Sequence, residues 1–407
     1  MPTPFYFIFA AMLFRDVIGQ AETKKKLVNL VKQNRMSHAL LFLGNEGCGA
    51  LPLALSLVQF MVCDKVNGSN ASTSLFGEPS PPDLSITDAC GLCAPCQKAQ
   101  QMIHPDIHFS YPVVPRKSGD KPLSTDYAPE WREFIKLYPY GNAYDWLQFI
   151  NAENKQGNIT AHECNDIIRK LALKSFESEY KFLVMWMPEY LGNEGNKLLK
   201  LIEEPPANTL FILVAEHESQ ILPTILSRTQ LVKIPPILNE DIEAALVERV
   251  KLGPDQARQL AWVTEGNYHE ALQLIQHAEE DWQALLRDWL NSILKTGPTA
   301  QVKWVEDINK LGREKQKQFL RYFNHLLEQS VRSRVMGAQG QSLPGQENDF
   351  VLRLNKIADI SQQQAIIEEL DRAGYYIERN ANSKLLFMAL TLKIYHIIQD
   401  KSLILMN

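Results

Sequence analysis

Apolar positions along the chain form either short continuous runs or helical repeats. The runs typical of buried strands occupy residues 38–43, 182–187, 210–214 and 231–234. Helical patterns end near residue 35, cover residues 159–173, and cover residues 193–204 up to Pro205 and Pro206, which stop a helix. The strand, glycine turn and helix that follow residue 38 form the first unit of a parallel sheet. The pattern therefore predicts an α/β domain that ends before the Pro235-Pro236 boundary.

The rest of the chain has a helical pattern, with one break at residues 337–346. Near the C-terminus an apolar stripe at helical spacing comprises Leu385, Leu386, Ala389, Leu390, Ile394 and Ile397. Such a stripe is typical either of a core helix or of an interface helix. We therefore expect helical domains after the α/β domain.

Two segments interrupt these patterns. Residues 64–88 are rich in Ser, Pro, Asn and Gly, which predicts a flexible loop. Residues 104–158 are rich in Tyr, Trp and Pro, and their elements cannot be assigned from the pattern. The number of large aromatic residues there favours an ordered insertion whose role the sequence does not define.

Composition narrows the class of protein. A length of 407 residues predicts two or three domains, and 45% apolar with 22% charged residues is typical of globular chains. The formal net charge of -5 means that any contact with nucleic acid requires a local patch. No apolar run is long enough to span a bilayer, and residues 1–13 lack the positive segment of a secretory signal. We expect an N-terminal extension there and a soluble, cytoplasmic protein without a membrane partner.

The cysteines are clustered in a way that indicates metal binding. Cys90, Cys93 and Cys96 are separated by two-residue gaps, which let one tight turn direct three thiolates at a single zinc ion. No acid or base nearby suggests an open coordination position, so the zinc is expected to be structural. We expect Cys48 and Cys164 to be ordinary core or surface residues.

A glycine loop at residues 44–51 has the glycines of a phosphate-binding loop, Gly44, Gly47 and Gly49. A working loop continues with Lys and then Ser or Thr, because Lys neutralises the phosphates and the hydroxyl binds magnesium. This chain has Ala50 and Leu51 instead. Tight, magnesium-dependent binding of ATP is therefore not expected, and a plain glycine turn is an alternative interpretation of the loop.

The acidic residues of an ATPase are also missing from their expected place. Nucleotide hydrolases of this class carry Asp-Glu at the end of the next apolar strand, to bind magnesium and orient water. Here Trp186 and Met187 stand at those positions, and Glu189 comes two residues too late. Two independent changes thus predict a chain with the shape of an ATPase but without its activity.

A set of ordered motifs resembles the AAA+ clamp-loader family of bacterial DNA polymerase III, most closely its delta-prime branch. The motifs are FRDVIGQ (14–20), the glycine loop, the cysteine cluster, HPD (104–106), NKLLKLIEEPP (196–206) and LPTILSRTQ (222–230). The resemblance covers residues 14 to about 275 and continues more weakly to IERNANSKLLF (377–387). It implies an AAA+ P-loop-type parallel sheet (14–234) with an inserted zinc module (63–96), then a small helical lid (235–280) and an all-α C-terminal collar (281–407). The delta-prime branch typically has a degenerate nucleotide site.

The resemblance also assigns individual residues. Family members carry a cysteine at the end of the helix before the cluster, which nominates Cys63 as the fourth zinc ligand, with His104 as the rival. Clamp-loader subunits place an arginine in a Ser-Arg-Cys motif that reaches a neighbouring subunit's ATP; here the pair is Ser227-Arg228, and Thr229 replaces the cysteine. The arginine that senses nucleotide in an active lid is replaced by Glu270. The alternative interpretation is that Arg228 is an ordinary surface residue that forms a salt bridge.

These observations predict a non-catalytic clamp-loader subunit that supports ATP-driven loading of the sliding clamp on primed DNA. The implied partners are the gamma/tau and delta subunits, and, through the complex, the clamp and the DNA. One alternative is an active, gamma/tau-like ATPase subunit, which Ala50, Leu51 and Glu270 disfavour. Another is an independent zinc-containing DNA-binding protein, which the net negative charge disfavours.

Overall fold

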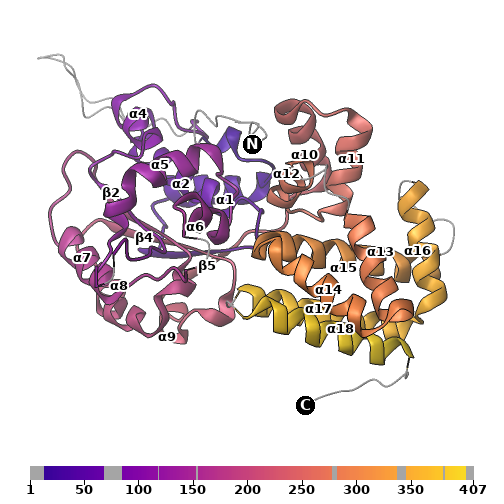
Figure 1. Ribbon diagram of the computed structural model, residues 1–407. Coiled ribbons are helices and arrows are strands. Elements are labelled where there is room, and N and C mark those ends of the chain that lie inside the picture. The colour runs from indigo at the N-terminus through magenta and orange to yellow at the C-terminus, as the bar shows by residue number, and fades with distance from the viewer. Residues whose placement is uncertain are drawn as a thin grey trace, which may run out of the picture. The chain divides into compact units, whose positions relative to one another are not determined.

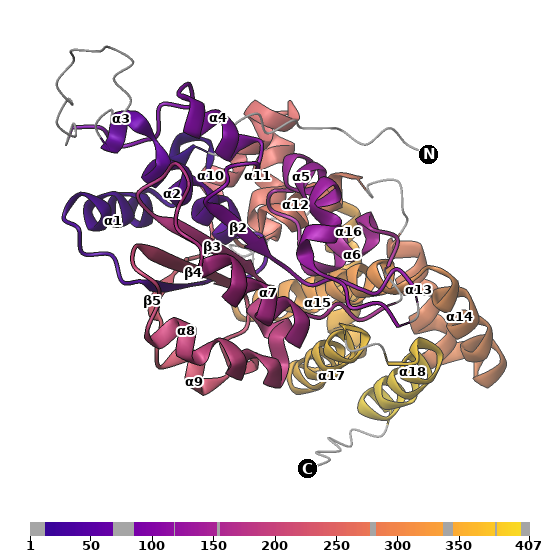
Figure 2. The same ribbon diagram turned by 90° about the vertical axis from the view of Figure 1, so that its left-hand side faces the viewer.

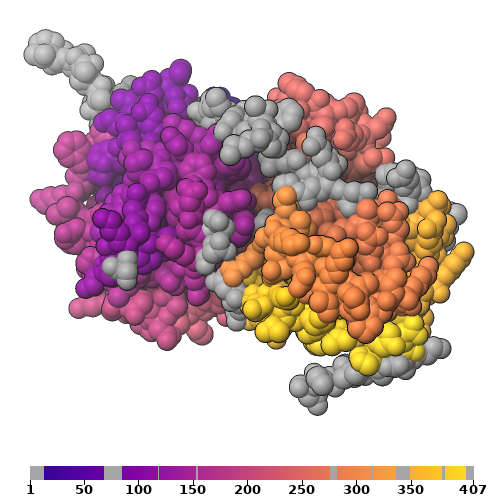
Figure 3. Space-filling model, in the orientation of Figure 1, coloured from indigo at the N-terminus to yellow at the C-terminus, as the bar shows by residue number. Residues whose placement is uncertain are grey.

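The computed structural model describes residues 13–67, 85–117, 119–152, 155–276, 282–336, 345–378 and 381–399. The chain divides into two compact units, Met1–Gln276 and His277–Asn407. The first unit runs from indigo to salmon in Figures 1 and 3, and the second continues to yellow. The predicted extension at residues 1–13, apart from Leu13, and most of the break at 337–346 lie outside the described residues. No helix in the described part of the chain combines the length and the apolar character that crossing a bilayer requires.

The first unit is built on a five-stranded sheet whose order is β2-β3-β4-β1-β5. All neighbouring strands pair in parallel. The strands are β1 (Ala39–Leu43), β2 (Ile107–Ser110), β3 (Lys181–Trp186), β4 (Thr209–Ala215) and β5 (Gln230–Lys233). The prediction of an α/β fold with a parallel sheet is confirmed, and four of the strands lie where the apolar runs predicted them. β2 is the strand that the sequence did not identify, inside the aromatic-rich segment.

Helices cover both faces of the sheet (Figures 1 and 2), and this explains the continuous apolar runs. Leu40 and Phe42 of β1 belong to one core cluster, and Ala39 and Leu41 belong to the other. The elements that contribute to the first face are η1 (Phe14–Asp16), α1 (Ala21–Lys32), α2 (Ala50–Val62), α3 (Asp64–Asn67), α4 (Ala94–Gln100), η2 (Ser124–Tyr127), α5 (Ala128–Leu137) and α6 (Ala143–Phe149). Those on the second face are α7 (Ala161–Leu171), η3 (Pro188–Leu198), α8 (Leu199–Glu203) and α9 (Pro223–Leu226), and η4 (Glu218–Gln220) precedes α9.

The helix predicted for residues 193–204 is only partly correct. Residues 188–198 form the 3-10 segment η3, which Gly192 interrupts with φ 50° and ψ -142°, and regular α-helix covers only α8. Gly195 is packed so tightly against α9 that a Cβ there would lie 3.0 Å from Ile225 Cδ1. This close approach leaves little room for a side chain at position 195.

Of the loop predicted for residues 64–88, the structure describes residues 64–67 and 85–88. Its first residues form α3. At the other end, the Asp88 carboxylate accepts hydrogen bonds from the backbone of Phe14 (2.9 Å) and Arg15 (3.1 Å). The prediction of a loop is therefore wrong for residues 64–67, which are helical.

The aromatic-rich insertion packs as an ordered layer, as its composition predicted. Tyr111 and Trp131 stack with ring centroids 4.0 Å apart, and Trp146 meets both rings edge-on. The Trp146 indole nitrogen donates a hydrogen bond of 2.7 Å to the Pro112 carbonyl, which satisfies its buried polar atom. These contacts fix α5 and α6 against the sheet.

The last part of the first unit is a helical group with its own core. It consists of α10 (Asn239–Ala245), the π-helical turn η5 (Leu246–Val250), α11 (Pro254–Val263) and α12 (Tyr268–Gln276). Ile242, Leu246 and Tyr268 form the centre of this core, and Ile18 and Tyr140 from the preceding part of the unit join it.

The second unit is entirely helical in its described residues. Its elements are α13 (Trp282–Asn291), the π-helical turn η6 (Ser292–Thr296), α14 (Pro298–Lys310), α15 (Arg313–Met336), α16 (Gly345–Ile357), α17 (Ile360–Glu378) and α18 (Ser383–Gln399). Trp289 and Trp304 stack at 4.6 Å in the core. The residues of the predicted apolar stripe on α18 differ in burial. Leu390, Ile394 and Ile397 are buried, whereas the Leu385 side chain is 70% exposed.

Candidate functional site

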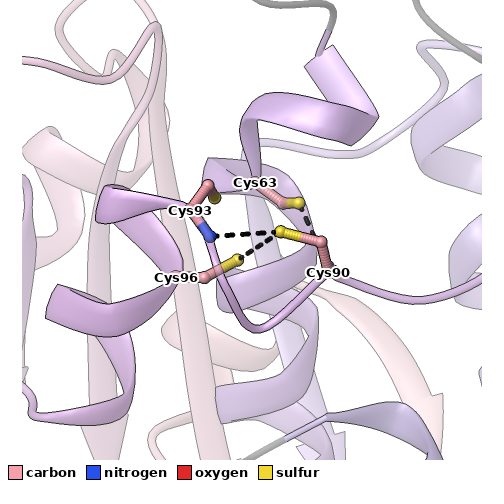
Figure 4. Close-up of side chains that lie close together, drawn as sticks. All are labelled: Cys63, Cys90, Cys93 and Cys96. Atoms are coloured by element: carbon pink, nitrogen blue, oxygen red, sulfur yellow. Dashed lines mark hydrogen bonds between the residues drawn. The ribbon is translucent and has the colours of Figure 1, made fainter.

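Four cysteines come together where α2 ends and α4 begins (Figure 4). Cys63 follows α2 directly, and Cys93 precedes α4. The four sulfur atoms, those of Cys63, Cys90, Cys93 and Cys96, all lie within 4.8 Å of one another. The sulfurs of Cys90 and Cys96 are 3.9 Å apart, and a tetrahedron with Zn–S bonds of about 2.3 Å has edges of about 3.8 Å. The cluster therefore has the size of a four-thiolate zinc site.

Backbone amides point at these sulfurs. The N–H groups of Leu92 and Cys93 donate to Cys90 Sγ at 3.4 and 3.3 Å, and the N–H of Cys90 donates to Cys63 Sγ at 3.3 Å. Hydrogen bonds of this kind favour the charged form of a thiol. The hydrogen bond with Cys96 lowers the pKa of Cys63 to about 4, while burial raises the pKa of Cys93 to about 11. A full set of four thiolates thus requires a cation to balance the charge.

His104, the rival fourth ligand, lies outside this group of donor atoms. Its Nδ1 accepts a hydrogen bond of 3.2 Å from the Asp106 amide, and its Nε2 faces Glu177 Oε1 at 3.3 Å. The structure brings Cys63, and not His104, to the three cysteines of the CGLCAPC motif. Cys48 and Cys164 are buried elsewhere as free thiols, and burial raises the pKa of Cys164 to about 11.

The glycine loop joins β1 to α2, which is the place of a phosphate-binding loop. Gly47 and Gly49 have φ values of 72° and 88°, which favour glycine. Ala50 and Leu51 open α2, and both are buried. The loop backbone thus has the predicted turn, but the side chains at the Lys and hydroxyl positions are apolar.

The ends of the neighbouring strands are apolar as well. Trp186 and Met187 are buried at the end of β3, beside the glycine loop. Glu189 points its Oε1 at the backbone amides of Glu216 and His217, at 2.6 and 2.8 Å. Burial raises the pKa of Glu189. Its carboxylate therefore supports the turn after β4.

Glu270 stands in the first turn of α12. Its backbone N–H donates a 3.0 Å hydrogen bond to Asn267 Oδ1, just before the helix begins. An acidic residue at this position is favourable because the helix N-terminus carries partial positive charge.

Arg228 lies after α9, and its guanidinium is bound within the same chain. Nε donates to Glu203 Oε1 at 2.6 Å, and Nη2 also contacts that oxygen. Nη1 donates to the Thr224 carbonyl at 2.8 Å and to Ser227 Oγ at 3.1 Å. The side chain is 32% exposed, so the guanidinium stays accessible from solvent.

The family of the chain follows from its similarity to known proteins. A family model described as DNA polymerase III, delta subunit, matches residues 19–238. This chain belongs to that family. The matched range includes the sheet, the glycine loop, the four cysteines and the Ser-Arg pair.

Three relatives illustrate the similarity. DNA polymerase III subunit delta' of Escherichia coli is 24% identical over 92% of this chain and 94% of its own length. The delta' subunit of Bacillus subtilis is 27% identical over 64% of this chain, and the gamma/tau subunit of Mycoplasma pneumoniae is 25% identical over 64%. The chain spans only 60% and 30% of the lengths of these last two relatives.

Among solved structures, a DNA polymerase III gamma subunit-related protein of Thermotoga maritima is 14% identical. The match covers 92% of this chain and 99% of the Thermotoga maritima chain, with a TM-score of 0.35. This score is too low for a comparison of the two folds.

Two residues of this region were not found from the sequence. Glu203 lies in the IEEPP motif, and nothing in its spacing indicated that it would contact Arg228, 25 residues further along. Tyr140 lies in the aromatic-rich segment, and the structure places its ring at the glycine loop. The only signal for Tyr140 was the unusual aromatic content of that segment.

Proposed function

We propose that this chain is a non-catalytic, delta-prime-type subunit of the DNA polymerase III clamp loader. The observation that carries the proposal is the match to the delta-subunit family across a sheet whose glycine loop lacks the Lys and hydroxyl residues. Gamma/tau and delta subunits would be its direct partners. The sliding clamp and primed DNA would be reached through the complex, in the cytoplasm.

The absence of ATP hydrolysis is supported by three local changes. Ala50 and Leu51 remove the cation and the magnesium ligand, Trp186 and Met187 replace the acids, and Glu270 would repel a triphosphate. These changes argue against the alternative of a gamma/tau-like ATPase.

The zinc ion proposed for the chain would be held by Cys63, Cys90, Cys93 and Cys96. Four soft thiolates suit zinc, and a closed set of four is typical of structural sites. Bound zinc would supply charge balance and rigidity there, tying the end of α2 to the start of α4.

Arg228 is proposed to act on an ATP held by a neighbouring subunit, with Ser227 as the residue that orients it. A guanidinium that stabilises the transition state of phosphoryl transfer from a neighbour accelerates hydrolysis by about 10³–10⁵ in well-studied cases. In this proposal residues 235–280 form the lid, and residues 281–407 form the collar that holds the subunits together.

Reconstitution of the complex from its purified subunits tests the function. Clamp loading on primed DNA should require this chain, while the chain alone should not hydrolyse ATP. Full loading by the complex that lacks this chain would contradict the proposal.

A further inference from the structure

The aromatic-rich insertion sends one side chain onto the glycine loop. The Tyr140 ring lies so close to Gly49 that a Cβ on the glycine would be 3.0 Å from Tyr140 Cε1. The Tyr140 hydroxyl accepts a 2.8 Å hydrogen bond from the Ile18 amide, and its ring meets Tyr268 edge-on at 5.0 Å. Tyr140 is 5% exposed, so it is a buried wedge between three parts of the unit.

The residues after Tyr140 hold the loop from the same side. Asn142 Nδ2 donates a 3.1 Å hydrogen bond to Glu46 Oε1 in the loop. Asn142 also caps α6, since its side chain accepts a hydrogen bond from the Asp145 amide. The Asn142 side chain therefore joins the start of α6 to the loop.

The start of α12 closes the loop from another side. The Tyr268 amide donates to the Gly47 carbonyl at 3.3 Å. Asn267 lies so close to Gly47 that a Cβ on the glycine would be 1.8 Å from Asn267 Oδ1. His269 Nε2 lies 3.2 Å from Asp145 Oδ2 and 3.6 Å from Glu46 Oε1. Loop, insertion and α12 thus form one connected set of contacts.

Little space remains above the loop. The cavity lined by Gly47, Gly49, Tyr140 and Trp186 has a volume of about 20 Å³, enough for about one water molecule. Phosphate binding to a glycine loop requires its backbone N–H groups to be accessible. As it stands in this structure, the space is smaller than a phosphate chain.

We propose that residues 139–145 are an intramolecular plug, with Tyr140 as the wedge, that occupies the glycine loop in place of a phosphate ligand and joins the loop to α12. This assigns a role to the aromatic-rich insertion, whose stacked core anchors the plug to the sheet. The plug goes beyond the proposed function. It explains what occupies the glycine loop within the first unit and does not depend on the role of the chain in a complex.

Cys48 provides a probe of the plug, because it lies inside the loop and is 1% exposed. Alkylation of Cys48 by iodoacetamide, followed by peptide mass spectrometry on the full chain, reports how often the loop opens. Tyr140→Ala should increase the rate of Cys48 alkylation at least ~10-fold, and Asn142→Ala should increase it less. The matched control is Tyr138→Ala, since Tyr138 packs on Phe134 and Phe149 and does not line the cavity.

The control should leave the alkylation rate near that of the wild type. Equal Cys48 rates in Tyr140→Ala, Tyr138→Ala and the wild type would overturn the plug. Should Tyr140→Ala fail to fold, the comparison of Asn142→Ala with the control decides in the same way. The result does not depend on the clamp-loader assay, so failure of either proposal can be recognised separately.

Discussion

The Glu203 carboxylate engages the Arg228 guanidinium at the surface of the first unit, with Arg228 Nε and Glu203 Oε1 2.6 Å apart. The residue proposed to reach a neighbour's ATP is therefore already paired with an anion in its own chain. Any phosphate that binds Arg228 must compete with this carboxylate. Because the pair is partly exposed, the interaction is worth about 0–1 kcal/mol, and the competition is weak enough for a phosphate to win.

Arg228→Ala should lower ATP hydrolysis by the reconstituted complex on primed DNA, while folding, zinc content and assembly stay unchanged. Arg228→Lys should recover only part of the loss, because an ammonium cannot reproduce the planar fork of the guanidinium. The matched control is Arg258→Ala, which breaks a comparable exposed pair with Glu243. Unchanged hydrolysis and loading in Arg228→Ala would mean that Arg228 is a surface residue.

Glu203→Gln removes the competing charge and keeps a hydrogen-bond acceptor. We expect it to raise steady-state hydrolysis by the complex at most about fivefold, which corresponds to about 1 kcal/mol. The double variant Glu203→Gln, Arg228→Ala should behave like Arg228→Ala alone. An increase that persists without Arg228 would show that Glu203 acts through another residue.

Cys93→Ser should release the zinc, which elemental analysis would otherwise find at about one ion per chain. Loss of a ligand should weaken zinc binding by more than the roughly 10–100-fold that loss of an outer-shell partner costs. Cys164→Ser should keep the metal, since that thiol lies outside the cluster. Retention of zinc in Cys63→Ser, together with its loss in His104→Ala, would reverse the choice of fourth ligand.

The chain alone should show no saturable binding of a fluorescent ATP analogue at micromolar concentrations in magnesium. The reason is the lack of both the cation and the magnesium ligand at residues 50 and 51. Turnover of ATP by the purified chain would refute this expectation.

Glu163 should make stability depend on pH. It is 1% exposed, and burial raises the pKa of its carboxyl above the ordinary value of 4.5. A folded-state pKa that is higher than the unfolded one gives most stability below about pH 4.5, and stability falls as the pH rises to the folded value. Glu163→Gln should therefore reduce the loss of stability as the pH rises above about 4.5.

Urea unfolding at several pH values measures this dependence, with the exposed Glu133→Gln as the control. The Gln side chain can still accept the 2.8 Å hydrogen bond that the Ser124 amide donates to Glu163 Oε2. An identical pH profile for Glu163→Gln and the wild type would show that this carboxylate does not couple folding to pH.

Features set by neighbouring residues were predictable from the sequence. The apolar runs predicted four of the five strands, because a strand buried on both faces must be apolar along its whole length. Gly47 and Gly49, followed by Ala50 and Leu51, indicated both the turn and the absence of the Lys and hydroxyl side chains. The two-residue gaps of Cys90, Cys93 and Cys96 indicated a metal ligand set in the same way.

Contacts between distant residues were decided only by the tertiary structure. β2 is short and lies in a segment of mixed polarity, so its pairing with β3 has no local signal. The positions of Glu203 beside Arg228 and of Tyr140 on Gly49 join residues 25 and 91 positions apart in the chain. Sequence patterns indicate which face of an element is buried. The packing of the whole unit determines which side chain from another segment contacts that face.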